Sequence, residues 1–243
     1  MVVNSNHTTS NRAAVVVYFL LATLISLVFR IYMPSRLDLL KLPYGYGLNI
    51  LVGAGPLLAA EITRKLFDNA DRRLPLYSDS LSKSLLFMLA PAFVLLIIGV
   101  KNKQHQNEHL FAVQVCLLWF VYIFGEESGW RGYLQQILNV SDYKKALIVG
   151  LQWYLWHLSF LFERTSLIKE LVFLVVLLTG SFLAIKITKR TNSLLPAIGL
   201  HFSFSVITNV PNPSHYLTGV VAMLVTWGIL LWKWSVKNES ISG

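Results

Sequence analysis

The chain has 243 residues, of which 55% are hydrophobic and only 14% are charged, and its formal net charge is +9. Typical soluble domains carry about 25% charged residues, so long uncharged runs at this composition exclude an ordinary soluble protein and indicate several membrane spans. No basic stripe with interleaved aromatic residues accompanies the positive charge, and we expect no nucleic-acid partner. The single cysteine, Cys116, excludes an intramolecular disulfide and a cysteine cluster for a metal.

Apolar stretches separated by polar breaks predict about eight membrane-spanning helices. In chain order they cover residues 13–29, 42–60, 84–100, 110–125, 146–162, 171–185, 193–210 and 216–232. The second contains Pro56 and the seventh contains Pro196, so these two have the weakest helical pattern. The predicted fold is therefore all-α, a polytopic transmembrane helical bundle that forms a single integral membrane domain over residues 1–243.

The distribution of basic residues predicts the orientation of the chain. The first span is not expected to be a signal peptide, because its basic region is one arginine and no small-residue cleavage site follows. Lys and Arg are roughly twice as numerous in the loops that share a side with the termini as in the others. We therefore expect a multi-pass protein of a bacterial cytoplasmic membrane, in contact with the lipid bilayer, with both termini in the cytoplasm.

Two adjacent glutamates follow the fourth predicted span, where residues 125–131 read GEESGWR. If this segment is helical, Glu127 and Arg131 lie on one face and can pair, while Glu126 points about 100° away. A structural ion pair at a helix end would explain one glutamate and leave the other unexplained. Ionisable residues within a membrane are usually functional.

Two histidines lie in later predicted spans. His157 lies among aromatic residues in the fifth, and His201 lies in the seventh, followed at one-turn intervals by Ser205 and Asn209. Alone, each histidine would be interpreted as an interhelical hydrogen-bonding residue. Together with Glu126 they could converge on one wet cavity, where a carboxylate acts as a general base and imidazoles orient water, stabilise an oxyanion or bind a metal.

Residues 105–109 read HQNEH, which fits the H-x-x-E-H pattern of a class of zinc peptidases. His105 and His109 lie in a polar loop beside lysines, with no obvious third ligand. We interpret the pattern as a chance match and leave the role of the two histidines open.

In combination, the motifs resemble those of the CPBP family, the type II CAAX prenyl endopeptidases and the related bacteriocin-processing and immunity membrane proteins. The family pattern is E-E-x-x-x-R, then an aromatic residue-x-x-x-H, then H-x-x-x-N or D. Residues 126–131, 153–157 and 201–205 match it in order, except that serine stands at the last position. The resemblance covers about residues 110–209, so that spans four to seven would form the catalytic core.

The resemblance implies an intramembrane endopeptidase that hydrolyses a peptide bond in a membrane-associated protein or peptide. Glu126 and His157 would activate a water molecule, His201 would stabilise the oxyanion, and Arg131 would hold Glu127 or meet the substrate carboxylate. The implied catalytic residues are Glu126, His157 and His201, and the implied supporting or substrate-binding residues are Glu127, Arg131 and Ser205.

The resemblance leaves the cofactor open. Glu126, His157 and His201 would make a three-ligand site with one open position, as catalytic zinc requires. That arrangement would leave no free general base except Glu127, which is better placed to pair with Arg131. We expect a glutamate mechanism without a metal, with zinc as the alternative.

Two other functions are compatible with the sequence. Ser205 favours a catalytically weak or inactive membrane scaffold or immunity protein of the same family. A proton-coupled transporter would also use buried carboxylates, but no inverted repeat is visible. Peptide pheromones, bacteriocin precursors and lipid-anchored proteins are all compatible substrates.

Overall fold

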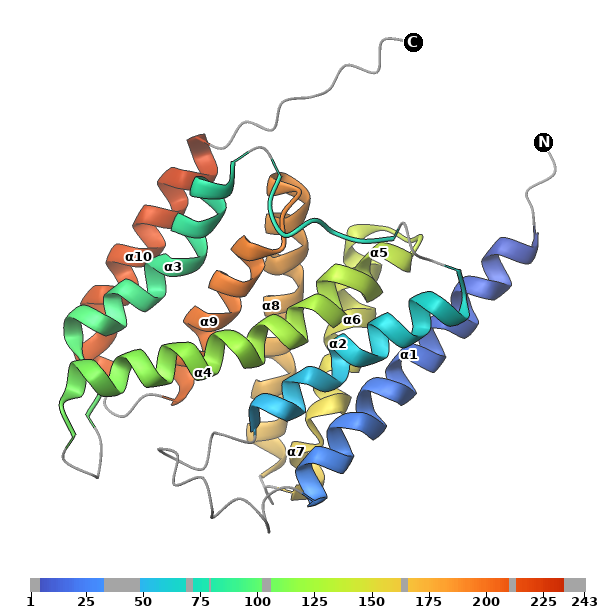
Figure 1. Cartoon of the computed structure of the whole chain (residues 1–243), viewed down its shortest axis with the longest axis horizontal. Helices are drawn as coiled ribbons and strands as arrows, with labels where there is room; N and C mark the ends of the chain where they lie inside the picture. The colour runs from blue at the N-terminus through green and yellow to red at the C-terminus, as the bar shows by residue number, and fades with distance from the viewer. Residues whose placement is uncertain are drawn as a thin grey trace. The chain divides into compact units, whose positions relative to one another are not determined.

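The computed structural model describes residues 5–32, 49–68, 72–78, 80–101, 106–162, 166–209 and 213–233. Every regular element within these ranges is a helix (Figure 1), which confirms the predicted all-α class. In chain order the helices are α1 (Ser5–Tyr32), α2 (Asn49–Leu66), α3 (Leu81–Ile98), α4 (Glu108–Gly129), the π-helix η2 (Trp130–Leu134), α5 (Gln135–Ile137), α6 (Asp142–His157), α7 (Ser159–Phe162), α8 (Leu167–Thr191), α9 (Leu195–Asn209) and α10 (Pro213–Lys233).

Each predicted span overlaps a helix, but several helix ends differ from the prediction. The fourth predicted span ends at residue 125, whereas its helix continues through Gly129 into η2 and on to Ile137. The fifth is divided at Leu158, which adopts a left-handed conformation (φ 53°) between α6 and α7. Pro56 lies inside α2 without ending it. Residues 42–48 and 210 lie outside the described ranges.

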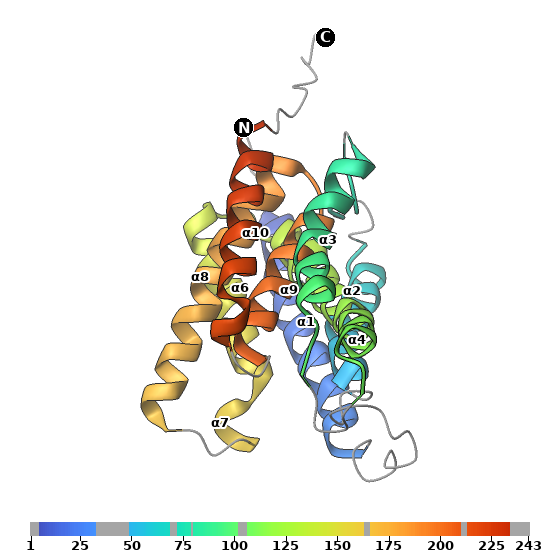
Figure 2. The ribbon, with the colours of Figure 1, turned by 90° about the vertical axis from the view of Figure 1, so that its left-hand side faces the viewer.

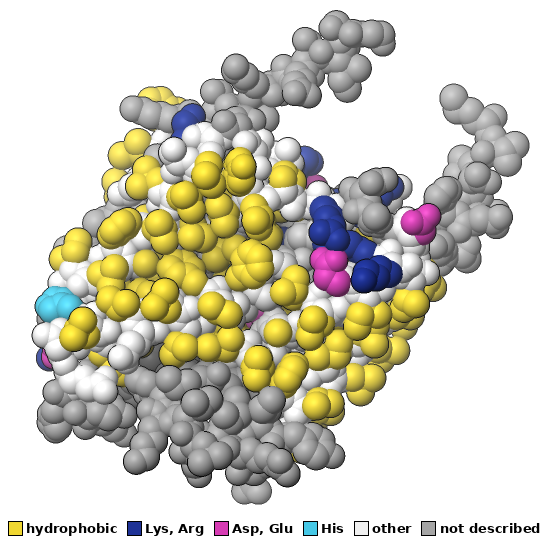
Figure 3. Space-filling view, viewed as in Figure 1, with side chains coloured by type: hydrophobic (Ala, Val, Ile, Leu, Met, Phe, Trp, Pro, Cys, Tyr) yellow, Lys and Arg dark blue, Asp and Glu magenta, His cyan; other side chains and the backbone are white. Residues whose placement is uncertain are grey.

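Four helical segments of the described chain are long and apolar enough to cross a bilayer. They are Asn11–Ile31, Leu81–Ile98, Glu108–Ile137 and Leu167–Thr191. Large apolar side chains on them are exposed, including Leu20, Phe93, Leu117 and Val175, and hydrophobic side chains cover wide areas of the face drawn in Figure 3. Such a surface suits lipid rather than water. The chain is an integral membrane protein, and the count of eight spans stays a prediction.

The chain forms two compact units, whose boundaries fall inside α4 and α8. The first comprises Met1–Leu74 and Val121–Lys186, and the second comprises Pro75–Phe120 and Ile187–Gly243. Each unit joins segments that are far apart in the sequence.

In the first unit, α1 and α2 lie side by side (Figure 1), and glycines bring α2 against α4. A Cβ atom on Gly53 would lie 2.5 Å from the Tyr122 carbonyl oxygen, and one on Gly125 would lie 2.4 Å from the Gly53 carbonyl oxygen. Side chains cannot fit at such distances, so the two backbones touch because both positions are glycine. This contact places α2 directly beside the turn that carries the two glutamates.

In the second unit, α9 and α10 pack on α3 (Figure 2). The rings of Phe87 and Trp227 stack at 4.7 Å, and Trp227 Nε1 donates to the Phe87 carbonyl oxygen at 3.1 Å. A Cβ atom on Gly199 would lie 2.6 Å from that same oxygen, so α9 also approaches α3 closely.

The start of α9 is fixed by the segment that precedes α3. The N–H groups of Leu194 and Leu195 donate to the carbonyl oxygens of Pro75 and Leu76 at 2.9 and 3.1 Å. These bonds satisfy donors that a helix N-terminus leaves without intrahelical partners. Pro196 follows in the first turn, where its missing N–H costs nothing.

Candidate active site

Glu127 and Arg131 form a buried ion pair on one face of the helix, as their spacing predicts. Arg131 Nη1 lies 2.7 Å from Glu127 Oε1, and both side chains are 1% exposed. Arg131 Nη2 donates to Ser181 Oγ on α8 at 3.2 Å, and the guanidinium carbon lies 4.4 Å from the centre of the Trp153 ring. The arginine is therefore held by three different elements of the first unit.

Glu126 is fully buried and bonds to a different helix. Its Oε2 accepts a hydrogen bond from Trp153 Nε1 on α6 at 2.6 Å. The Tyr122 hydroxyl, one turn earlier on α4, also interacts with this carboxylate, and its Oε1 has no hydrogen-bond partner of ordinary geometry among the residues that the structure describes. Because a buried polar atom without a partner is costly, this oxygen is suited to a water molecule or a substrate group.

Trp153 links the ionisable groups of the site. Its indole N–H bonds to Glu126 and its ring faces Arg131. Its carbonyl oxygen is 2.8 Å from His157 Nδ1, one turn further along α6. The carbonyl can only accept, so Nδ1 carries the hydrogen in the neutral ring and Nε2 carries the lone pair.

His157 is the last residue of α6, and its ring is packed among aromatic side chains. The ring centres of Trp156 and Phe173 both lie 5.0 Å from its own, and both rings meet it edge to face. Its carbonyl oxygen accepts a hydrogen bond from Arg30 on α1. These contacts fix the backbone and the ring plane of His157 in the first unit.

The helix widens into the π turn η2, which begins three residues after Glu127. Gln135 N–H reaches back to the Trp130 carbonyl oxygen, and Gln136 Nε2 donates to the Arg131 carbonyl oxygen at 3.0 Å. All five residues of η2 are buried. Such turns insert one residue into a helix and often occur at functional sites.

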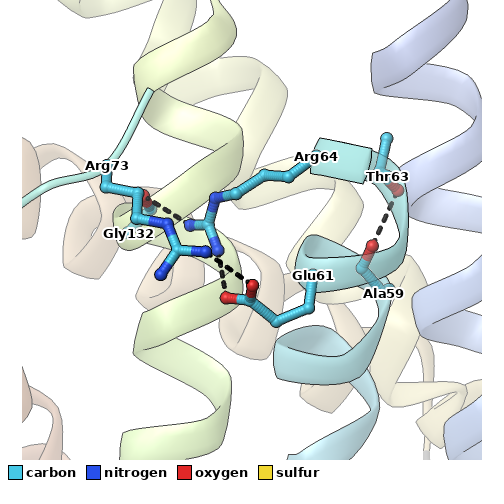
Figure 4. Close-up of polar contacts among 6 residues, drawn as sticks. All are labelled: Ala59, Glu61, Thr63, Arg64, Arg73 and Gly132. Carbon is cyan, nitrogen blue, oxygen red and sulfur yellow. Dashed lines mark hydrogen bonds and ion pairs between the residues drawn. The ribbon is translucent and has the colours of Figure 1, made fainter. Parts of the chain in front are cut away.

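The middle of η2 is held by α2 (Figure 4). Arg64 Nη2 donates to the Gly132 carbonyl oxygen at 3.2 Å, and Arg64 also pairs with Glu61. The second oxygen of Glu61 lies 2.7 Å from Arg73 Nη2. Burial lowers the pKa of the Arg64 guanidinium, an effect that the Glu61 carboxylate opposes, and an arginine starts so far above neutral pH that it stays charged. We call this set of contacts the Arg64 latch.

His201 and Ser205 lie one turn apart on α9, in the second unit, and both are half-buried. Asn209 is the last residue of α9, and its side chain is outside the described part of the structure. The convergence of His201 with Glu126 and His157 stays a prediction, as do the oxyanion roles of His201 and Ser205.

The choice between a zinc site and a site without a metal stays a prediction. No three His, Cys, Asp or Glu side chains among the described residues are grouped as metal ligands would be, so we derive no step through a metal. Of the H-x-x-E-H pattern, His105 lies outside the described ranges, and His109 Nδ1 lies 2.8 Å from the Leu96 carbonyl oxygen.

The structure adds residues that sequence reasoning did not assign to the site. Trp153 had been placed only as the aromatic position of the second motif, and its indole donor follows from the bond to Glu126. Ser181 binds Arg131. The sequence indicates this role only through the position of Ser181, a polar residue beside Gly180 in a largely apolar run. Arg64 gave no such signal, because it lies in a polar stretch rich in charge.

Comparison with known proteins gives two matches. Residues 108–207 match the family model described as Type II CAAX prenyl endopeptidase Rce1-like. The chain is also 27% identical, over 139 residues, to "CAAX prenyl protease 2" of Methanococcus maripaludis, an alignment that covers 48% of this chain and 51% of the relative. The matched part therefore spans about half the length of that relative. The family match includes all three motifs and leaves out α1, α2 and α3.

Proposed function

Because residues 108–207 belong to the Rce1-like family of type II CAAX prenyl endopeptidases, we propose that this protein is an intramembrane endopeptidase. It would hydrolyse a peptide bond in a membrane-associated protein or peptide. The observation that carries the proposal is the Glu126 carboxylate, which is buried, held through Oε2 by Trp153, and without a partner at Oε1 among the described residues. A carboxylate in this setting can accept a proton from a water molecule.

In the proposed reaction, Glu126 takes a proton from water, and the water oxygen attacks the carbonyl carbon of the scissile peptide bond. His157 assists by accepting a hydrogen bond from that water at Nε2. His201 and Ser205 donate hydrogen bonds to the oxyanion that forms. When the intermediate collapses, the C–N bond breaks and the proton on Glu126 passes to the departing amine. The products are a carboxylic acid and an amine, with one water molecule consumed.

Arg131 has a supporting role in this proposal. Two neighbouring buried carboxylates repel each other, and Arg131 compensates the charge of Glu127. Glu126 is then the carboxylate left for proton transfer. Since Arg131 already binds Glu127, Ser181 and the Trp153 ring, we favour this role over contact with a substrate carboxylate.

The substrate classes to test are peptide pheromones, bacteriocin precursors and lipid-anchored proteins. The relative from Methanococcus maripaludis is named "CAAX prenyl protease 2", so a prenylated peptide belongs in the same panel. We further propose a bacterial cytoplasmic membrane as the location, with both termini in the cytoplasm, on the charge asymmetry of the loops.

A second function is favoured by one observation, the serine at position 205 where the family pattern has Asn or Asp. A shorter hydroxyl donor stabilises an oxyanion less well, and the protein would then be a membrane scaffold or immunity protein that binds a peptide without cutting it. In that case Glu126→Gln leaves binding intact.

The test compares the wild type with Glu126→Gln, both purified in detergent, on a panel of quenched peptides with and without a chelator. Glu170→Gln is the matched control, because Glu170 is also buried in the first unit and binds Tyr154 and Ser159. Cleavage lost only in Glu126→Gln supports the proposed glutamate mechanism. Loss in the chelated wild type points to a metal, and binding without cleavage by any sample supports the scaffold.

A further inference from the structure

Helix α1, which lies outside the family match, reaches the candidate site through Tyr18. The Tyr18 side chain is 0% exposed. Its ring meets Trp130 edge to face, with centres 5.5 Å apart, and lies 5.3 Å from the ring of Tyr133. Both partners belong to the π turn that follows the two glutamates, so Tyr18 is packed against the segment that carries Arg131.

The hydroxyl of Tyr18 lies directly over the backbone between the motif residues. A Cβ atom on Gly129 would lie 2.5 Å from the Tyr18 Oη, and it would also lie 2.5 Å from the Cβ atom and 2.6 Å from the carbonyl oxygen of Pro56 on α2. The hydroxyl therefore lies against the backbone at Gly129, where the approach of α2 also requires glycine. Gly129 lies between Glu127 and Arg131 in the sequence. The hydroxyl also interacts electrostatically with Arg131, Glu126 and Glu127. The hydroxyl is therefore buried against the backbone of the motif, where the charges of its ionisable groups act on it.

Several buried polar atoms of Tyr18, the π turn and Glu126 have no hydrogen-bond partner within the described part of the chain. Among them are the Tyr18 Oη, the Trp130 Nε1, the Arg131 Nε and the Glu126 Oε1. The tyrosine and tryptophan atoms carry hydrogens to donate, and the carboxylate oxygen can accept. A water molecule is the simplest group that both accepts and donates, and it therefore complements this set.

A packing role explains the ring of Tyr18 but not its hydroxyl. Phenylalanine would fill nearly the same volume and would place no polar atom in a buried position inside a membrane-spanning helix, where such an atom is costly.

We propose that Tyr18 is a further active-site residue, whose hydroxyl donates a hydrogen bond to the water molecule that Glu126 deprotonates. The water would donate one hydrogen to Glu126 Oε1, accept the Tyr18 hydrogen with one lone pair, and direct its other lone pair at the peptide carbonyl carbon. This inference rests on the proposed function, because the water is the nucleophile of that reaction.

The test measures kcat, KM and the melting temperature of full-length wild type, Tyr18→Phe and Tyr143→Phe in detergent. Tyr143 is the matched control, since it is 72% exposed at the start of α6 and its ring stacks on Phe182. We expect Tyr18→Phe to lower kcat about ten- to a hundredfold, the range for one lost hydrogen bond to a reacting group. KM and the melting temperature should stay unchanged, because the hydroxyl has no partner among the described residues to lose.

The outcomes separate this inference from the proposed function. If Glu126→Gln is inactive while Tyr18→Phe keeps the wild-type kcat, the inference is overturned and the endopeptidase proposal stands. A lower kcat in Tyr18→Phe that comes with a matching fall in melting temperature means that the hydroxyl is structural, which also overturns it. A wild type that cleaves no substrate class overturns both.

Discussion

Replacing Arg131 by methionine would leave the Glu127 carboxylate buried without its cation. Removing one partner of a buried ion pair costs about 3–5 kcal/mol of unfolding free energy, because the remaining charge stays in a medium of low dielectric constant. Arg131→Met also removes the bond to Ser181 and the contact with the Trp153 ring, so we expect the upper part of that range. The double variant with Glu127→Gln removes both charges and should recover about 1–3 kcal/mol of the summed single losses.

Denaturant unfolding of the wild type, the two single variants and the double variant in one detergent gives this coupling energy. Lys186 and Asp142 are the matched control, because their charged atoms lie 3.6 Å apart and their side chains are 49% and 21% exposed. A pair so accessible should show a coupling of about 0–1 kcal/mol. If the coupling between Glu127 and Arg131 is no larger than that of the control, the pair is not desolvated, and the predicted loss of stability is wrong.

The remaining predictions concern the contacts between α2 and the motif. Gly125→Ala should lower the unfolding free energy by about 1–3 kcal/mol, because its Cβ atom would lie 2.4 Å from an α2 carbonyl oxygen. Gly180→Ala, where the nearest atom lies at 3.7 Å, should be neutral, and equal losses would contradict the close approach. A lysine at position 64 cannot bind both the Gly132 carbonyl oxygen and Glu61, as Arg64 does in the Arg64 latch. We therefore expect Arg64→Lys to lower kcat on the peptide panel about tenfold. Arg73→Lys is the control, since Arg73 binds Glu61 and does not bind the Gly132 carbonyl oxygen. If the two variants have equal activity, the Arg64 latch does not support η2.

The parts of the fold and site that depend on local sequence were predictable. Long apolar runs produce helices because a bilayer leaves no other way to satisfy the backbone of a single segment. The pairing of Glu127 with Arg131 follows from a spacing of four residues on one helix, so it needs no knowledge of the neighbouring helices. The motifs within residues 108–207, which match the family model, indicated which residues to consider as a candidate site.

The parts that depend on tertiary contacts were not predictable. The end of the fourth span was placed at residue 125 because polar residues follow, yet the helix continues, since Trp153 and Ser181 from other helices bind those polar side chains. Tyr18 had no distinguishing pattern, because one tyrosine in an apolar helix is ordinary. Tyr18 contacts Gly129 and the π turn, and these contacts depend on how α1 packs in the first unit.

The backbone contact between Gly53 and Gly125 limits how the two halves of the first unit can change during evolution. Because the two positions share one space, a larger residue at either cannot be absorbed by a change of rotamer, and a whole helix must move instead. Moving α2 would also shift Arg64 and the π turn that it holds. A single substitution of either glycine is therefore expected to be destabilising. This constraint reaches beyond the segment that resembles the family, because Gly53 lies outside residues 108–207.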